Sequence, residues 1–222
     1  MSWKPLLLSL EIATLATLIT LVLGTALALL LRWKRLPARE LVDAIISTPL
    51  VLPPTVLGYY LLVVMGRDSA IGHAWEAVFG SPLVFSFGAA VIAAAVGSIP
   101  LVVRATKVGL DAVDPNLVAA ARTLGARPLR VLVTVVLPLA GPGIVAGAMM
   151  GFARALGDYG ATAMFAGARI EGTPTASIYV MEELYNLHDQ NVAGMALAMT
   201  AVGVTMLYLA NRLTRRLQPH AG

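Results

Sequence analysis

Residues 113–142 read VDPNLVAAARTLGARPLRVLVTVVLPLAGP, and this stretch governs how the rest of the chain is interpreted. It begins as a polar segment rich in arginine and then becomes apolar without a clear break. Asp114 precedes a proline and predicts the start of a short helix, because its carboxylate can accept hydrogen bonds from free backbone N–H groups. Gly125 predicts the end of that helix in a left-handed cap, and Pro128 the start of a second one. We therefore expect a helix, a turn and a helix attached to a membrane span, with small side chains where another protein approaches.

The chain as a whole is too apolar for a soluble globular protein. Its 222 residues are 58% hydrophobic and 13% charged, and the mean hydropathy is +0.81. Stretches of about 20 residues with almost no Asp, Glu, Lys or Arg are long enough to cross a bilayer as helices. We expect one all-α transmembrane domain over residues 1–222, with a cytoplasmic loop at about 111–138 and five transmembrane helices at about 6–31, 44–65, 83–103, 136–156 and 192–210.

The distribution of the basic residues predicts the orientation of these spans. Short cytoplasmic loops carry an excess of Lys and Arg, so the side with most of them is expected to be the cytoplasm. If the five spans alternate, twelve of the sixteen fall on one side, namely Arg32, Lys34, Arg35, Arg39, Arg104, Lys107, Arg122, Arg127, Arg130, Arg212, Arg215 and Arg216. We therefore expect the N-terminus outside and the C-terminus in the cytoplasm. The net charge of +4 then reflects topology in a lipid membrane and predicts no nucleic-acid partner.

Several kinds of chemistry are disfavoured by what the sequence lacks. There is no cysteine and no cluster of histidines at metal-ligand spacing, so no metal site is expected. An intramembrane protease would need a Ser-His pair or two aspartates within the spans, but all three histidines lie outside them. A secondary transporter driven by an ion gradient usually has paired acids or a histidine chain at mid-membrane, and this chain fits that pattern poorly. The motif GxxxxGK[ST] is absent, so ATP hydrolysis would have to come from another chain.

Prolines and glycines mark two unusual places in the predicted spans. Pro53 and Pro54 lack backbone N–H groups and predict a break or kink in the second span. Such a break either lines a transport pathway or serves packing, and the sequence favours neither. Glycines recur every four residues in the fourth span and predict a groove for close approach of another helix, in the same or a second subunit; they are Gly143, Gly147 and Gly151.

A charged pair follows this groove. Arg154 and Asp158 are four residues apart, which places them on one side of a helix in a position to form an ion pair. A pair that neutralises itself favours a structural role. A gating role along the pathway is the alternative, in which Arg154 attracts an oxyanion only when it is released from Asp158.

The opening stretch resembles the EAA loop of ABC importer permeases. That loop has the form EAA, three residues, Gly, nine residues, Ile, one residue, Leu-Pro, and the spacing of Ala120-Ala121, Gly125, Val135 and Leu137-Pro138 is the same. The sequence departs from the pattern at Ala119, where the family usually has Glu, and at Val135, in place of Ile. The resemblance implies coupling helices that dock in a groove on a cytoplasmic ATPase. The coupling residues would be Asp114, Ala119, Ala120, Ala121, Leu124, Gly125, Leu137 and Pro138.

Other segments resemble the molybdate permeases within that family. ARALGDYGAT at 153–162 is similar to the segment ARxLGEFGAT, with Asp158 for Glu and Tyr159 for Phe. PLVLPPTVLGYYLLVVMGRDSAIG at 49–72 and AARTLGA at 120–126 also look more like molybdate than sulfate permeases. The resemblance implies the type I ABC importer permease fold, a homodimer in the cell inner membrane, two cytoplasmic ABC ATPase subunits and an external molybdate-binding protein. ATP and Mg would be used by the ATPase, and this chain would bind no cofactor and catalyse no reaction. Tungstate would be a co-substrate, and a permease for sulfate, thiosulfate or another oxyanion is the alternative.

Overall fold

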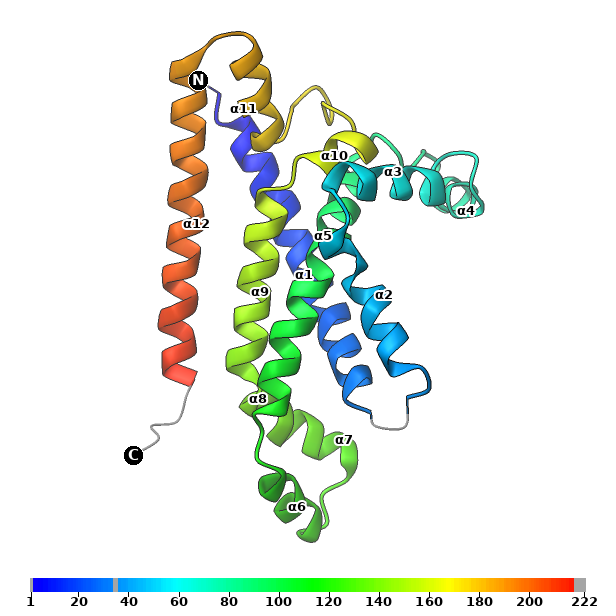
Figure 1. Ribbon diagram of the computed structural model, residues 1–222, viewed down its shortest axis with the longest axis vertical. Helices are drawn as coiled ribbons and strands as arrows, with labels where there is room; N and C mark the ends of the chain where they lie inside the picture. Colours follow the sequence, from blue (N-terminus) through cyan, green and yellow to red (C-terminus); the bar gives the residue numbers. More distant parts are fainter. Residues whose placement is uncertain (1, 34–35, 218–222) are drawn as a thin grey trace.

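The computed structural model describes residues 2–33 and 36–217, and these residues form a helical protein (Figure 1). Among the described residues, three helices are long and apolar enough to cross a membrane: α1 (Lys4–Arg32), α5 (Phe87–Asp111) and α12 (Asp189–Leu217). In the part of the chain described, the only β pairing is an isolated bridge between Ile170 and Thr173. The predicted all-α class is therefore confirmed.

Two further spans are bent. Helices α2 (Arg39–Val51) and α3 (Pro54–Met65) meet at 117°, and the helical segment Pro128–Leu139 meets α9 (Gly141–Leu156) at 66°. If each bent pair crosses once, the described part of the chain has five spans, the number that its composition predicts. The first bend confirms the break expected at Pro53 and Pro54, because neither residue can donate the hydrogen bond that would continue α2.

The remaining helices are short and lie near the two ends of the long ones (Figure 1). The end that carries α11 also carries α10 and α4, and the opposite end carries α6 and α7. Between α7 and α9 the chain forms a π-helix and then α8. The bounds are α4 (Ala70–Phe79), α6 (Pro115–Thr123), α7 (Pro128–Val131), the π-helix (Leu132–Val136), α8 (Leu137–Leu139), α10 (Gly160–Phe165) and α11 (Ala176–Tyr185).

The centre of the molecule consists of α1, α5 and α9, which pack along their lengths. Alanines supply much of the buried surface of α5, including Ala89, Ala90 and Ala93, so neighbouring backbones can approach closely. Helix α12 packs at the edge of this core, against α9 and α11. Only 6% of its most apolar 18-residue stretch is buried. Helix α2 lies on the opposite side and contains no buried residue (Figure 1). Both peripheral helices therefore present most of their surface to lipid or to another protein.

Helix α11 is fastened to the first helix of the chain. The backbone N–H of Ala176, in the first turn of α11, donates a hydrogen bond of 2.8 Å to the Ser9 hydroxyl oxygen on α1. Thr175 caps the same turn, because its hydroxyl accepts from the N–H of Ile178. The two segments joined by the Ser9 bond are 167 residues apart, so α11 is held at this end by both α1 and α12.

Candidate functional site

The helical hairpin formed by α6 and α7 has the local structure that the sequence predicts. The Asp114 carboxylate accepts a hydrogen bond of 2.9 Å from the N–H of Asn116, and Pro115 occupies the first helical position. After α6, Gly125 has a φ of +81°, a conformation that favours glycine. The N–H of Ala126 then donates to the carbonyl of Ala121 at 3.1 Å, which closes the turn before α7.

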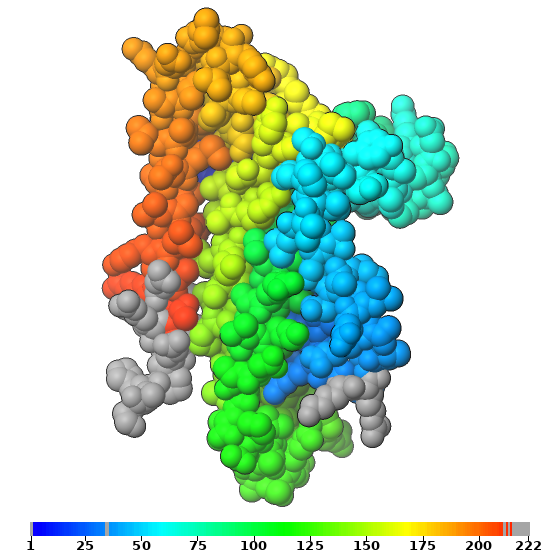
Figure 2. Space-filling view, in the orientation of Figure 1, coloured from blue at the N-terminus to red at the C-terminus, as the bar shows by residue number. Residues whose placement is uncertain are grey.

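The outer surface of this hairpin is uncovered. No residue of α6 is buried, and the hairpin forms the end of the molecule opposite α11 (Figure 2). Leu124 is 88% exposed and Leu129 is 72% exposed, so two large apolar side chains face outward from a segment rich in arginine. The inner side of the hairpin packs against the core, because Val113, Val131 and Val136 belong to a buried cluster with residues of α1 and α5. Sequence reasoning included Leu124 but missed Leu129, whose signal is a large apolar side chain between Pro128 and Arg130.

A π-helix connects the hairpin to α8 and α9. The N–H of Leu137 donates to the carbonyl of Leu132, five residues earlier, instead of the usual four. Pro138 follows and has no N–H to donate, so the regular α-helical ladder is interrupted at this point. Leu137 and Pro138 form part of α8, and the 66° bend comes directly after it. Displacement of the hairpin would therefore act on α9 through an irregular joint.

The glycine groove of α9 packs against α5 of the same chain. A methyl group built on Gly143 would lie 2.5 Å from the Cα of Gly109, a distance shorter than any real contact. Gly147 faces the carbonyl of Val102 at 3.1 Å, and Gly151 faces a methyl group of Val102 at 2.8 Å, measured in the same way. The two backbones are therefore in direct contact, and larger side chains at these positions would separate the helices.

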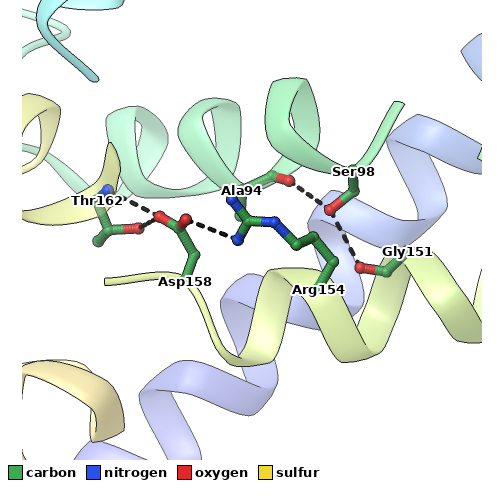
Figure 3. A network of polar contacts seen from close by, with 6 residues as sticks. All are labelled: Ala94, Ser98, Gly151, Arg154, Asp158 and Thr162. Atoms are coloured by element: carbon green, nitrogen blue, oxygen red, sulfur yellow. Dashed lines mark hydrogen bonds and ion pairs between the residues drawn. The ribbon is translucent and has the colours of Figure 1, made fainter. Parts of the chain in front are cut away.

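Arg154 and Asp158 form an ion pair of 2.8 Å between Nη1 and Oδ1 (Figure 3). The Asp158 side chain is 2% exposed, and its other oxygen, Oδ2, accepts hydrogen bonds of 2.9 and 2.8 Å from the N–H and hydroxyl of Thr162. The Arg154 side chain is 27% exposed and extends toward α5 at Gly97. The carboxylate thus has partners in α9 and α10, and it holds the start of α10 against the end of α9.

Helix α10 also packs tightly on α3, next to the proline break. A methyl group on Gly160 would meet the N of Thr55 at 2.9 Å and Pro54 at 3.0 Å, and one on Gly58 would meet the carbonyl oxygen of Ala161 at 2.8 Å. The structure therefore brings Pro53-Pro54 and Arg154-Asp158 into one region, at the end of the core near α11 (Figure 1). It does not bring them near the hairpin, which lies at the other end. Among the described residues, no group of three or more His, Asp or Glu is placed to hold a metal ion.

The Asp158→Asn substitution is expected to destabilise the protein, because it leaves the largely buried Arg154 without its counter-charge. Removing one partner of such a pair costs about 3 kcal/mol, whereas replacing both costs much less. We therefore expect a clear fall in the thermal unfolding midpoint of the detergent-solubilised protein for Asp158→Asn, and partial recovery when Arg154→Met is added. A double variant that is no more stable than the single one would show that the pair is not energetically coupled.

Comparison with known proteins gives one family and several close relatives. Residues 13–221 match the family described as binding-protein-dependent transport system inner membrane component. The chain is 40% identical to the molybdenum transport system permease protein ModB of Escherichia coli (strain K12), over 99% of this chain and 96% of that protein. It is 29% identical to the sulfate transport system permease protein CysW of Synechocystis sp., over 96% of this chain and 78% of that protein.

A solved structure has the same fold. The chain is similar to a protein in a crystal structure of the inward-facing MetNI methionine ABC transporter, with a TM-score of 0.74 and 19% sequence identity. The similarity covers 97% of this chain and 95% of that one. The arrangement of bent and straight helices described above is therefore that of an ABC importer permease.

Proposed function

Because this chain belongs to the family of binding-protein-dependent transport system inner membrane components, we propose that it is the membrane-spanning permease subunit of an ATP-driven molybdate importer. The observation that carries this proposal is the 40% identity to a molybdenum permease along 99% of the chain. The chain is a multi-pass component of the inner membrane and is not itself an enzyme. Tungstate is included in the proposal, because its oxyanion closely matches molybdate in charge and size.

We propose that the α6–α7 hairpin docks on a cytoplasmic ATPase that binds ATP and Mg. Support comes from its uncovered outer surface, where small side chains such as Ala119 and Ala120 lie beside the exposed Leu124. The chain has no phosphate-binding GxxxxGK[ST] motif of its own. The hairpin would then lie in the cytoplasm and the N-terminus outside, in agreement with the distribution of arginines.

The pathway would form between two copies of this chain, with one ATPase beneath each. In lipid, the backbone groups freed at a broken helix must be covered by protein or face a water-filled cavity. The break before Pro53-Pro54 frees carbonyl groups of α2, yet α2 has no buried residue in the single chain. A second copy on this side would satisfy that requirement.

The outer part of the pathway would be controlled by α3 and α10. These helices pack through Gly58 and Gly160, and the Arg154–Asp158 pair holds them to α9. ATP binding would close the ATPase dimer, displace the hairpin and act through the irregular joint at 132–139 on α9. An external binding protein would deliver the oxyanion at the end that carries α4 and α11.

Transport by the reconstituted complex tests this proposal. We expect vesicles containing this chain, its ATPase and its binding protein to accumulate molybdate only when ATP is supplied on the ATPase side. Tungstate should compete strongly and sulfate weakly. Preferential uptake of sulfate would favour the alternative suggested by the similarity to CysW. Uptake driven by an ion gradient without ATP would contradict the proposal.

A further inference from the structure

Arg104 lies on α5 and belongs neither to the α6–α7 hairpin nor to the Arg154–Asp158 ion pair. Its Nη2 donates a hydrogen bond of 2.9 Å to the Ser47 hydroxyl on α2, and its side chain is exposed. Among the residues that the structure describes, no carboxylate lies within 4.0 Å of this guanidinium. Arg104 is therefore a cation held by a neutral hydroxyl at the junction of α2 and α5.

Arg104 shares one side of α5 with the guanidinium of Arg154. A methyl group built on Gly97 would lie 3.4 Å from Arg154 Nη2 and 3.8 Å from Leu57 on α3, so this side of α5 faces both Arg154 and α3. Arg104 follows Gly97 by seven residues, which is two helical turns or about 10 Å along the axis. The two guanidinium groups therefore flank the two arms of the broken span, with Arg154 beside α3 and Arg104 beside α2.

The same junction continues toward the hairpin end of the molecule. One turn beyond Arg104, Lys107 lines a cavity of about 420 Å³ between α5 and the start of α2. Arg39 also lines this cavity, and Glu40 and Asp43 supply two carboxylates. Cations thus follow one another along this side of α5. Acidic groups occur beside Arg154, where Asp158 is paired with it, and again in this cavity, where Glu40 and Asp43 would repel a bound anion into solution.

From this arrangement we infer that Arg104, oriented by Ser47, is an inner binding site that the tetrahedral oxyanion occupies as it passes the α2–α5 junction. The inference rests on the proposed function. A guanidinium has several N–H donors in a fixed plane, so one N–H can bond to Ser47 while others bind an oxyanion. Because its partner is a neutral hydroxyl, Arg104 can accept the anion without first breaking an ion pair. Arg154 differs in this respect, since Asp158 already occupies it.

The test compares Arg104→Gln with wild type in vesicles containing the ATPase and the binding protein, with radiolabelled molybdate as the probe. We expect about tenfold less molybdate uptake per ATP hydrolysed, because one charge-assisted contact to the anion is lost. ATPase activity stimulated by the binding protein should be retained. Arg104→Lys should recover much of the uptake, since it keeps the charge. The matched control is Arg212→Gln, which removes an exposed cation from α12, far from α2, and should leave uptake unchanged (Figure 1).

A second arm distinguishes the oxyanion from a lipid phosphate, which has the same chemistry. The measurements are repeated in vesicles of phosphatidylcholine alone and in vesicles that also contain phosphatidylglycerol. An uptake defect present in both kinds of vesicle supports binding of the oxyanion, whereas a defect that appears only with the anionic lipid assigns Arg104 to headgroup binding and overturns the inference.

Parallel loss of uptake and ATPase activity would indicate a structural role for Arg104 and would also overturn the inference. If wild type transports sulfate instead of molybdate, the proposed function fails, and Arg104 is tested with sulfate. Unchanged uptake in Arg104→Gln overturns this inference alone.

Discussion

The Gly143→Leu variant is expected to lose the native packing of its transmembrane core. Position 143 has no room for even a methyl group, because the atoms that meet it belong to the backbone of α5 at Gly109 and Ala105. Backbone atoms in a packed helix cannot move aside as a flexible side chain would, so α5 and α9 must separate. We expect destabilisation of about 4 kcal/mol or more, which corresponds to a fall of about 10 °C or more in the thermal midpoint. Size-exclusion chromatography of heated, detergent-solubilised protein measures this.

The matched control is Gly203→Leu on α12. Gly203 is also a helical glycine in a predicted span, but no atom lies within 4 Å of a methyl group built on it. The same substitution should therefore leave the midpoint nearly unchanged at this position. If both variants lost the same stability, the effect would come from leucine in a transmembrane helix in general, and the close contact of α5 and α9 would not be its cause.

The Ala120→Trp variant is expected to fold normally but no longer to bind its ATPase partner. Ala120 is exposed on α6, so a bulky side chain there disturbs no contact within the chain. It would, however, hold the hairpin away from a surface that must approach closely, and interfaces tolerate such misfits poorly. We expect co-purification of the ATPase to be lost and ATP-driven molybdate uptake to fall at least tenfold, to background. The thermal midpoint of the isolated chain should not change.

The control for this variant is Ala74→Trp, which places the same side chain on an exposed position of α4. Helix α4 protrudes near the end of the molecule that carries α11, away from the hairpin (Figure 2). ATPase co-purification should therefore be retained in Ala74→Trp. Retention in both variants would contradict the assignment of α6 as the docking helix.

Local features of the fold were well predicted from the sequence. The Asp114 cap, the left-handed Gly125 and the break at Pro53-Pro54 depend on properties of single residues, which act wherever the chain places them. The Arg154–Asp158 pair forms as predicted, but α9 ends at Leu156, so Asp158 reaches Arg154 from the turn after the helix and not from the helix itself. The coupling role proposed for the hairpin came from the family resemblance, because spacing and composition alone would not have suggested it.

Contacts between distant segments were not predictable in this way. Nothing in the spacing of Gly143 indicates that its partner is Gly109, because the pairing depends on how α5 and α9 are aligned. Likewise, the bond between Arg104 and Ser47 depends on the angle at which the broken span returns past α5. The π-helix at 132–136 was also missed, since Pro138 can be accommodated by a kink or by a change of hydrogen-bonding register, and only the structure distinguishes them.

The hydrogen bond between Ser9 and Ala176 has a consequence for the order in which the protein is assembled. Ser9 leaves the ribosome 167 residues before Ala176. Until then the hydroxyl of Ser9 lacks its native partner, and it can bond only within its own helix or to water near the membrane surface. Helix α11 and the span that follows it therefore join a core whose other helices are already in the membrane. Of the described spans, α12 is therefore the last to join the core during biosynthesis, and a chain interrupted before Ala176 would leave Ser9 on α1 without its native partner.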